Sequence, residues 1–141
     1  MRVSLTDEAR RYIALFEDVT GATAVDCVFD EDHDQVLFVV TAGEMGQAIG
    51  PDGRRVKRLE DRIGEDVELV EDAPTPEGFV ANALAPAAVY NVTISENGDL
   101  VAYAEVDRAD HGAAIGTNGR NIEAAKRLAA RHFEIDDIQL T

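Results

Sequence analysis

Two short glycine-rich segments carry the spacing most suggestive of chemistry in this sequence. Residues 46–54 read Gly-Gln-Ala-Ile-Gly-Pro-Asp-Gly-Arg and residues 112–120 read Gly-Ala-Ala-Ile-Gly-Thr-Asn-Gly-Arg, so six of nine positions are identical at an offset of 66. Glycine adopts positive φ and has no Cβ, which lets another backbone approach closely. If a helix follows such a turn, its first N–H groups and its dipole attract an anion, and the adjacent arginine can grip phosphate oxygens. The pattern therefore predicts two phosphate-binding corners.

An isolated Gly-x-x-Gly is usually an ordinary helix–helix turn, so the elements around each copy decide its meaning. In the first half, Thr6 is a good helix N-cap, and apolar residues at helical spacing follow it until Gly21. Val- and Phe-rich strands are expected at 23–29 and 35–41, joined by a solvated acidic turn, 30–34. The loop, a basic helix to about residue 62 and a strand at 66–71 complete the unit.

The second half repeats this order after a Pro-rich break at 72–76. It predicts a helix at 77–86, strands at 88–95 and 99–106 around Asn97-Gly98, helices at 109–115 and 120–132, and a strand at 137–140. Each unit thus reads α-β-β-α-α-β. The predicted domains are residues 1–72 and 77–141, with 73–76 as a short linker.

Charge is distributed unevenly along the chain. There are 28 acids and 13 bases, a formal net charge of −15, and eleven of the bases are Arg. Nine bases lie within residues 54–62 and 120–131, directly after the two loops. The net charge should repel nucleic acid, yet the local charge beside each loop is positive. An acidic, Lys-poor composition is what we expect of a halophilic protein, because molar salt screens charge within about 3 Å.

Several other functions lack the residues they need. No stretch approaches the roughly 20 apolar residues that cross a bilayer, and the polar start of the chain does not resemble a secretory signal. Cys27 is the single cysteine, which leaves no internal disulfide and no cysteine-built zinc site. Asp30, Asp32 and Asp34 imitate a calcium loop, but Gln35 and Thr41 replace its glycine and glutamate. We therefore expect a cytoplasmic, non-enzymatic protein that has no cofactor or metal.

In this context, Ile-Gly-x-x-Gly-Arg resembles the KH domain, and the α-β-β-α-α-β order is similar to its type II form. Two such units in an acidic chain of 141 residues resemble the archaeal NusA-like transcription factors. The resemblance implies an α+β fold of two tandem type II KH domains packed against each other. It also implies that each loop clamps about four nucleotides of single-stranded RNA by the backbone, in transcription elongation or termination. RNA polymerase is a further candidate partner, and a monomer is expected.

The resemblance assigns RNA binding to the loops and to the bases that follow them. Ile49 and Ile115 are expected to anchor each turn and to offer an apolar floor to a base. In the first loop, Pro51 lacks an N–H and Asp52 places a carboxylate where a phosphate would lie, whereas Thr117 and Asn118 are uncharged. The full set is Ile49, Gly50, Pro51, Asp52, Gly53, Arg54, Arg55, Lys57, Arg58, Ile115, Gly116, Thr117, Asn118, Gly119 and Arg120.

Two alternatives remain open from the sequence alone. One is a KH protein that acts in RNA processing or at the ribosome. The other is a module that no longer binds RNA and whose acidic faces dock a protein such as RNA polymerase. Binding to random single-stranded RNA separates the RNA-binding functions from the docking module.

The repeat length generates a first prediction about stability. A unit of about 66 residues buries too small a fraction of its surface to be stable alone. We therefore expect a fragment of residues 1–73 to be poorly folded, with a broad thermal transition by circular dichroism. A cooperative transition at the temperature of the full chain would contradict this expectation.

Overall fold

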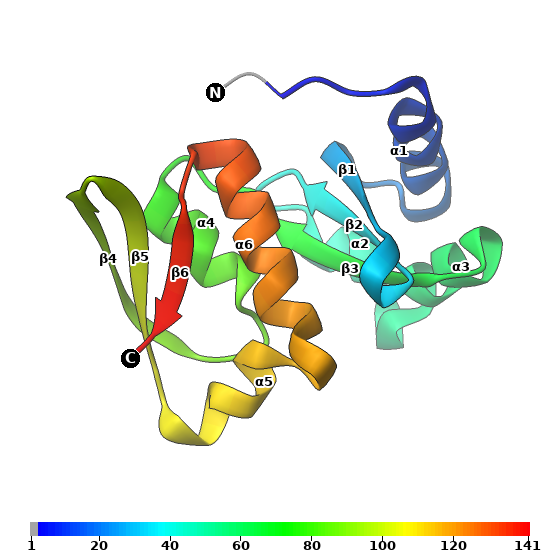
Figure 1. The fold of residues 1–141 in the computed structure, drawn as a ribbon. Helices are drawn as coiled ribbons and strands as arrows, with labels where there is room; N and C mark the ends of the chain where they lie inside the picture. The colour runs from blue at the N-terminus through cyan, green and yellow to red at the C-terminus, as the bar shows by residue number, and fades with distance from the viewer. Residues whose placement is uncertain (1–2) are drawn as a thin grey trace. The chain divides into compact units, whose positions relative to one another are not determined.

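The structure, a computed structural model, describes residues 3–141 and divides into two compact units, Ser4–Asp72 and Ala73–Thr141. Each unit holds one three-stranded sheet, so the protein has the expected α+β fold. Within residues 3–141, none of the helices is both long enough and apolar enough to cross a membrane. Figure 1 shows the helices and strands of both units.

The first unit follows the predicted order of elements. Its first two strands are antiparallel and its third is parallel to the second, with the second strand in the middle. The elements are α1 (Asp7–Thr20), β1 (Ala24–Asp30), a 3-10 turn (Glu31–His33), β2 (Gln35–Val40), α2 (Met45–Ile49), a 3-10 turn (Pro51–Gly53), α3 (Arg54–Ile63) and β3 (Asp66–Glu71).

The second unit repeats this topology, strand for strand. Its elements are α4 (Pro76–Ala83), β4 (Val89–Asn97), β5 (Asp99–Val106), a 3-10 turn (Arg108–Asp110), α5 (His111–Ile115), a 3-10 turn (Thr117–Gly119), α6 (Arg120–Phe133) and β6 (Asp137–Leu140). The duplication in the sequence is therefore a duplication of the fold, and both Gly-x-x-Gly corners lie between helices, as expected.

Local capping explains where the first helix of each unit begins. Thr6 Oγ1 accepts the N–H of Ala9 at 3.0 Å, which satisfies one of the free donors at the start of α1. Thr75 Oγ1 does the same for Gly78 at 3.1 Å. Helix α4 therefore begins at Pro76, one residue before the expected start, since proline fits the first helical turn.

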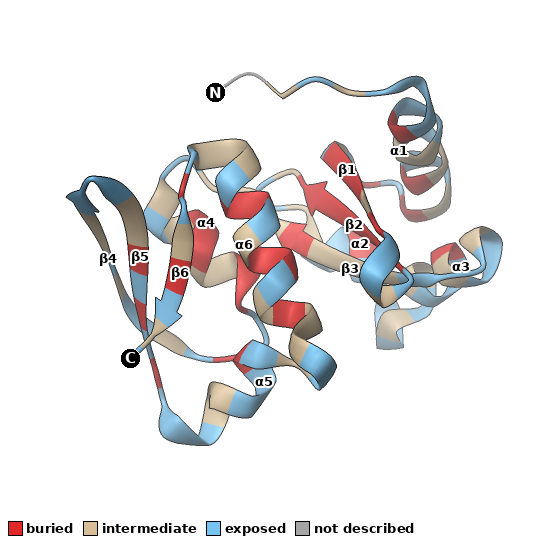
Figure 2. Ribbon diagram, in the orientation of Figure 1, coloured by how far each residue is buried: buried red, intermediate tan, exposed pale blue. Residues whose placement is uncertain are grey.

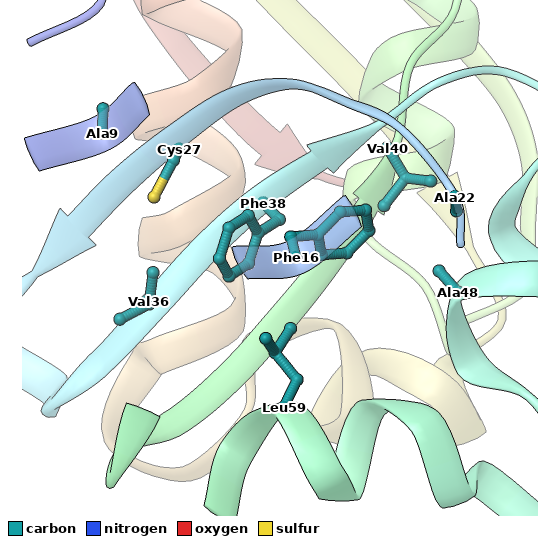
Figure 3. Close-up of a cluster of buried hydrophobic side chains, with 9 residues drawn as sticks. All are labelled: Ala9, Phe16, Ala22, Cys27, Val36, Phe38, Val40, Ala48 and Leu59. Carbon is teal, nitrogen blue, oxygen red and sulfur yellow. The ribbon is translucent and has the colours of Figure 1, made fainter. Parts of the chain in front are cut away.

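The core of the first unit lies between its sheet and its helices. The Phe16 and Phe38 rings stack with centroids 4.9 Å apart, and Leu59 from α3 is fully buried beside them (Figure 3). Val36 and Val40 come from the same face of β2, as the strand period of two requires. The core thereby ties α1, β2 and α3 together and fixes where α3, the helix after the first loop, begins.

The core of the second unit is built from smaller side chains. Ala124, Ala125, Leu128 and Ala129 form the buried face of α6, visible as a stripe in Figure 2. Phe79, from α4, supplies the large buried ring of this unit and lies 5.3 Å from the Phe133 ring, centroid to centroid. The packing of α6 fixes the helix that follows the second loop.

The acidic turn at 30–34 differs from the expectation of a fully solvated hairpin. Asp30 is only 7% exposed. Its carboxylate accepts a hydrogen bond from Gln35 Nε2 at 2.8 Å and lies 3.1 Å from His33 Nδ1. The difference arises because β2 is buried from its first residue, Gln35, so the polar groups at this end must find partners inside the protein.

Cys27 provides a direct probe of the first core. Its side chain belongs to the buried cluster and is 3% exposed. Burial, reinforced by the charges of Asp26 and Glu8, raises the pKa of its thiol to about 12. Because the thiolate is the reactive form, we expect the native protein to react with a thiol reagent at pH 8 only as fast as it unfolds. Rapid reaction without denaturant would contradict this packing.

Candidate nucleic-acid interface

The two loops have the same backbone conformation. Gly50 has φ 75° and ψ 174°, and Gly116 has φ 77° and ψ 170°. The third loop residues also match, because Asp52 has φ 55° and ψ 26° and Asn118 has φ 56° and ψ 26°. Asp and Asn tolerate this left-handed region better than other non-glycine residues. The repeated sequence thus encodes one specific corner twice.

The first glycine of each loop is required by packing as well as by φ. A Cβ on Gly50 would lie 2.7 Å from Arg55 Cγ, and one on Gly116 would lie 2.9 Å from Asn121 Cβ. At Gly50 the Arg55 side chain would have to shift, and at Gly116 the backbone of the following helix would have to move as well, because Asn121 N also lies 2.9 Å away. The first glycine therefore lets that helix start close against the loop.

The second glycine of each loop is open on its outer side. A Cβ on Gly53 would meet nothing within 4 Å, and one on Gly119 would only touch Glu123 Oε1 at 3.5 Å. Their φ values, 72° and 77°, still favour glycine. These positions are where the backbone of another molecule can approach most closely.

The helix that follows each loop begins without a side-chain cap. The capping residues, Gly53 and Gly119, have no side chain, and the first helical N–H groups, those of Arg54 and Arg120, donate to the loop carbonyls of Pro51 and Thr117. The N–H groups of a first helical turn and the positive end of the dipole favour an anion at such a position. The corner can therefore accept a phosphate from outside the protein.

Ile49 and Ile115 are exposed, and they do not anchor the turns as expected. Their exposed fractions are 40% and 42%. The anchors are the preceding residues, Ala48 and Ala114, which are both 0% exposed. A five-residue helix has room for only one inward-facing position here, and alanine occupies it. The isoleucines are left as apolar surface beside each loop, which fits the other half of the expectation.

The bases after the first loop are placed differently from one another. Arg54 Nη2 lies 3.9 Å from Asp52 Oδ2, and their side chains are 75% and 87% exposed. An ion pair this exposed is weak, but it directs part of the Arg54 charge toward the loop carboxylate. Lys57 and Arg58 are exposed on α3, whereas Arg120, after the second loop, is half-buried.

Arg55 has a bond that the sequence did not predict. Its Nη1 donates to the Gln47 carbonyl at 2.8 Å, so the guanidinium lies against α2, the helix before the loop. The corresponding residue of the second unit, Asn121, did not figure in the sequence-based site at all. Its Nδ2 lies within 3.5 Å of four carbonyl oxygens, those of Leu84, Ala85, Ala113 and Ala114. The available signal was a polar residue at the same repeat position in both units.

The structure thus places each set of predicted residues around its own loop. In both units, the loop lies together with the isoleucine before it and the bases after it. They lie together because a short helix turns directly into a long one, as α5 turns into α6 in Figure 1. Across residues 3–141, no group of three or more His, Cys, Asp or Glu side chains is arranged to hold a metal ion.

Comparison with known proteins agrees with this geometry. Residues 76–141 match the NusA-like second KH domain, and residues 10–96 match the KH domain. A "Probable transcription termination protein NusA" of Halobacterium salinarum is 67% identical over 141 residues, which is 100% of both chains. The protein of the same name from Methanococcus vannielii is 35% identical over 99% of this chain and 80% of its own length.

A bacterial relative and a solved structure extend the comparison. The transcription termination/antitermination protein NusA of Mycobacterium tuberculosis is 34% identical over 91 residues, 64% of this chain and 26% of that protein. The crystal structure of APE1850 superposes with a TM-score of 0.85 and 33% sequence identity, covering 97% of this chain and 100% of that one. With both corners built as KH loops and whole-length relatives of this kind, the chain belongs to the KH-domain family and, within it, to the NusA-like proteins.

Proposed function

We propose that this protein binds single-stranded RNA through its two Gly-x-x-Gly corners and acts in transcription termination and elongation, without enzymatic activity. The observation that carries the proposal is the identity of the two corners, down to the left-handed third residue, in a chain of the NusA-like family. RNA polymerase is the protein partner we expect, with the factor acting as a monomer in the cytoplasm.

Each corner offers three kinds of contact to RNA. The positive end of the α3 or α6 dipole and the neighbouring arginine, Arg54 or Arg120, attract a phosphate. The open side of Gly53 or Gly119 lets the sugar–phosphate backbone approach closely. The exposed face of Ile49 or Ile115 gives an apolar surface for one base. Together these contacts hold a strand by its backbone, as KH loops do.

Charge makes the two corners unequal. Residues 4–72 contain 18 acids and 7 bases, a net charge of −11, whereas residues 73–141 contain 10 acids and 5 bases, a net charge of −5. Within the loops, Asp52 carries a carboxylate at the position where Asn118 carries an amide. Pro51 has no N–H to donate, and Thr117 does. The second corner therefore provides the larger share of the RNA affinity.

The direct test is a titration of the full chain with random single-stranded RNA at several concentrations of potassium chloride. Saturable binding supports the proposal, and absence of binding at every salt concentration favours the protein-docking alternative. Cross-linking to RNA polymerase in the presence of nascent RNA then distinguishes a transcription role from RNA processing or ribosome association.

A charge exchange at the third loop position tests the inequality of the corners. Since Asp52 and Asn118 share one backbone conformation, Asn118→Asp and Asp52→Asn change charge without changing shape. We expect Asn118→Asp to weaken RNA binding about fivefold and Asp52→Asn to strengthen it by a similar factor, as a surface charge contact of about 1 kcal/mol implies. Equilibrium binding by fluorescence anisotropy measures both.

The matched control for this exchange is Asn91→Asp, an identical change on the exposed surface of β4. It alters net charge by the same amount away from both loops, so we expect a much smaller effect than that of Asn118→Asp. Equal effects of the two substitutions would show that RNA affinity depends on the net charge of the protein and not on the charge at the loop position.

Salt dependence provides a second test. Each phosphate neutralised on a single strand contributes roughly −0.7 to the slope of log K against log salt. We expect a shallow slope, with affinity flat over part of the range, because hydrogen bonds and apolar contacts dominate and the net charge of −15 repels RNA at low salt. Binding isotherms at several potassium chloride concentrations measure it. A steep, monotonic fall implying about five or more phosphate contacts would show that the basic helices dominate.

A further inference from the structure

One side chain in each unit joins the two helices that flank the loop. Arg55 donates to the carbonyl of Gln47 at 2.8 Å, and Asn121 donates to the carbonyl of Ala113 at 3.3 Å. The two donors, Arg55 and Asn121, are 66 residues apart in the sequence, and so are the two acceptors, Gln47 and Ala113. This separation is the offset of the repeat. Two chemically different side chains, a guanidinium and an amide, thus bind the same carbonyl of the short helix. Preservation of the bond despite a change of residue type points to a shared structural task.

The same side chains lie against the first glycine of each loop. A Cβ on Gly50 would lie 2.7 Å from Arg55 Cγ, and one on Gly116 would lie 2.9 Å from Asn121 Cβ, so neither fits beside these side chains as they stand. In each unit, this side chain therefore contacts the first glycine of the loop, while its polar end donates to a carbonyl of the helix before the loop. One side chain of the following helix thus connects the loop to the preceding helix.

Asn121 has the stronger set of bonds. It is 9% exposed, and its amide nitrogen also lies 3.5 Å from the Leu84 carbonyl oxygen, 3.3 Å from that of Ala85 and 3.1 Å from that of Ala114. The two amide hydrogens are thereby shared among carbonyls at the end of α4 and the end of α5. The Leu84 carbonyl also accepts the N–H of Ala87, so removal of this amide takes a donor chiefly from the carbonyls of Ala85, Ala113 and Ala114, which is costly where water cannot replace it.

We propose that Arg55 and Asn121 are positioning residues that hold the two Gly-x-x-Gly corners in their RNA-binding conformation, and that Arg55 acts through its bond to α2 and not through a phosphate. The proposal rests on RNA binding by these corners. The sequence grouped Arg55 with the exposed bases Lys57 and Arg58 as an RNA contact. The proposal groups it instead with Asn121, which donates to the corresponding carbonyl.

The two roles of Arg55 predict different salt behaviour. A side chain that contacts a phosphate contributes to counterion release, so its removal makes the log–log salt slope shallower by roughly 0.7. A side chain that only orients the loop lowers affinity at all salt concentrations and leaves the slope unchanged. The residue of the other repeat provides a further distinction, since Asn can make the bond to the carbonyl but carries no charge.

The experiment compares Arg55→Ala and Arg55→Asn in the full chain, with Arg58→Ala as the charge-matched variant on the exposed side of the same helix. We expect Arg55→Ala to weaken RNA binding about fivefold with an unchanged slope. Arg55→Asn should return the affinity to within about twofold of the unaltered protein, because the bond is restored without the charge.

Three outcomes would overturn the proposal for Arg55. One is a slope that becomes shallower by roughly 0.7 in both Arg55 variants. Another is an Arg55→Asn protein that binds no better than Arg55→Ala. The third is an Arg55→Ala protein that binds RNA as the unaltered chain does. Arg58→Ala shows how much slope and affinity change when an exposed charge of α3 is lost without loss of a bond to α2.

The second unit is tested with Asn121→Ala and the matched control Asn91→Ala, whose side chain is exposed on β4. We expect about tenfold weaker RNA binding for Asn121→Ala and no change for the control. Amide hydrogen exchange of Gly50, Asp52, Gly53 and residues 116–119 is measured on all variants. Faster exchange in the loop of the altered unit alone supports positioning, and unchanged exchange in both loops overturns it.

Hydrogen exchange also separates this proposal from the proposed function. If the unaltered protein does not bind RNA, the function is wrong, yet faster loop exchange in Arg55→Ala and Asn121→Ala still shows that these residues hold the corners. If Asn121→Ala unfolds the second unit, exchange rises throughout residues 73–141, and the Arg55 variants, whose bond lies near the surface, decide the question.

Discussion

The close approach of the first loop glycine to the side chain of the following helix is the contact on which both sites depend. Arg55 and Asn121 lie within 3 Å of where a Cβ would stand on Gly50 and Gly116, and each long helix begins immediately after a left-handed glycine. The open second glycine and the exposed isoleucine of each loop lie on either side of that turn in the sequence. A larger residue at Gly50 or Gly116 would therefore disturb the corner itself, even if every other side chain of the loop were kept.

Much of the fold follows from local patterns in the sequence. The cap at Thr6 and the end of α1 at Gly21 depend on residues that are neighbours in the chain, and the internal repeat gives each half of the sequence the same pattern. The roles of Arg55 and Asn121 could not be predicted in this way. Each acts across the turn on a carbonyl eight residues earlier, and a basic residue next to a phosphate-binding loop suggests phosphate contact unless the geometry is known.

The same limit explains the errors at Ile49 and Asp30. Both depend on which direction a side chain faces, and that direction is set by packing beyond the local pattern. On a five-residue helix, the periodicity is too short to distinguish the buried alanine from the exposed isoleucine. At the turn, an acidic run indicates solvent, but burial of Gln35 brings Asp30 inside with a hydrogen-bond partner. A single sequence does not determine the burial of a side chain when the residues packed around it come from distant segments of the chain.

Shape and charge are separable properties of these corners. The left-handed third position accepts Asp52 and Asn118 with φ values one degree apart, because both residues favour that region for the same local reason. The backbone conformation therefore does not depend on whether the loop carries a carboxylate. In a chain with a net charge of −15, this independence lets one corner become acidic while its architecture is preserved. The two corners can then differ in charge while they keep one backbone conformation.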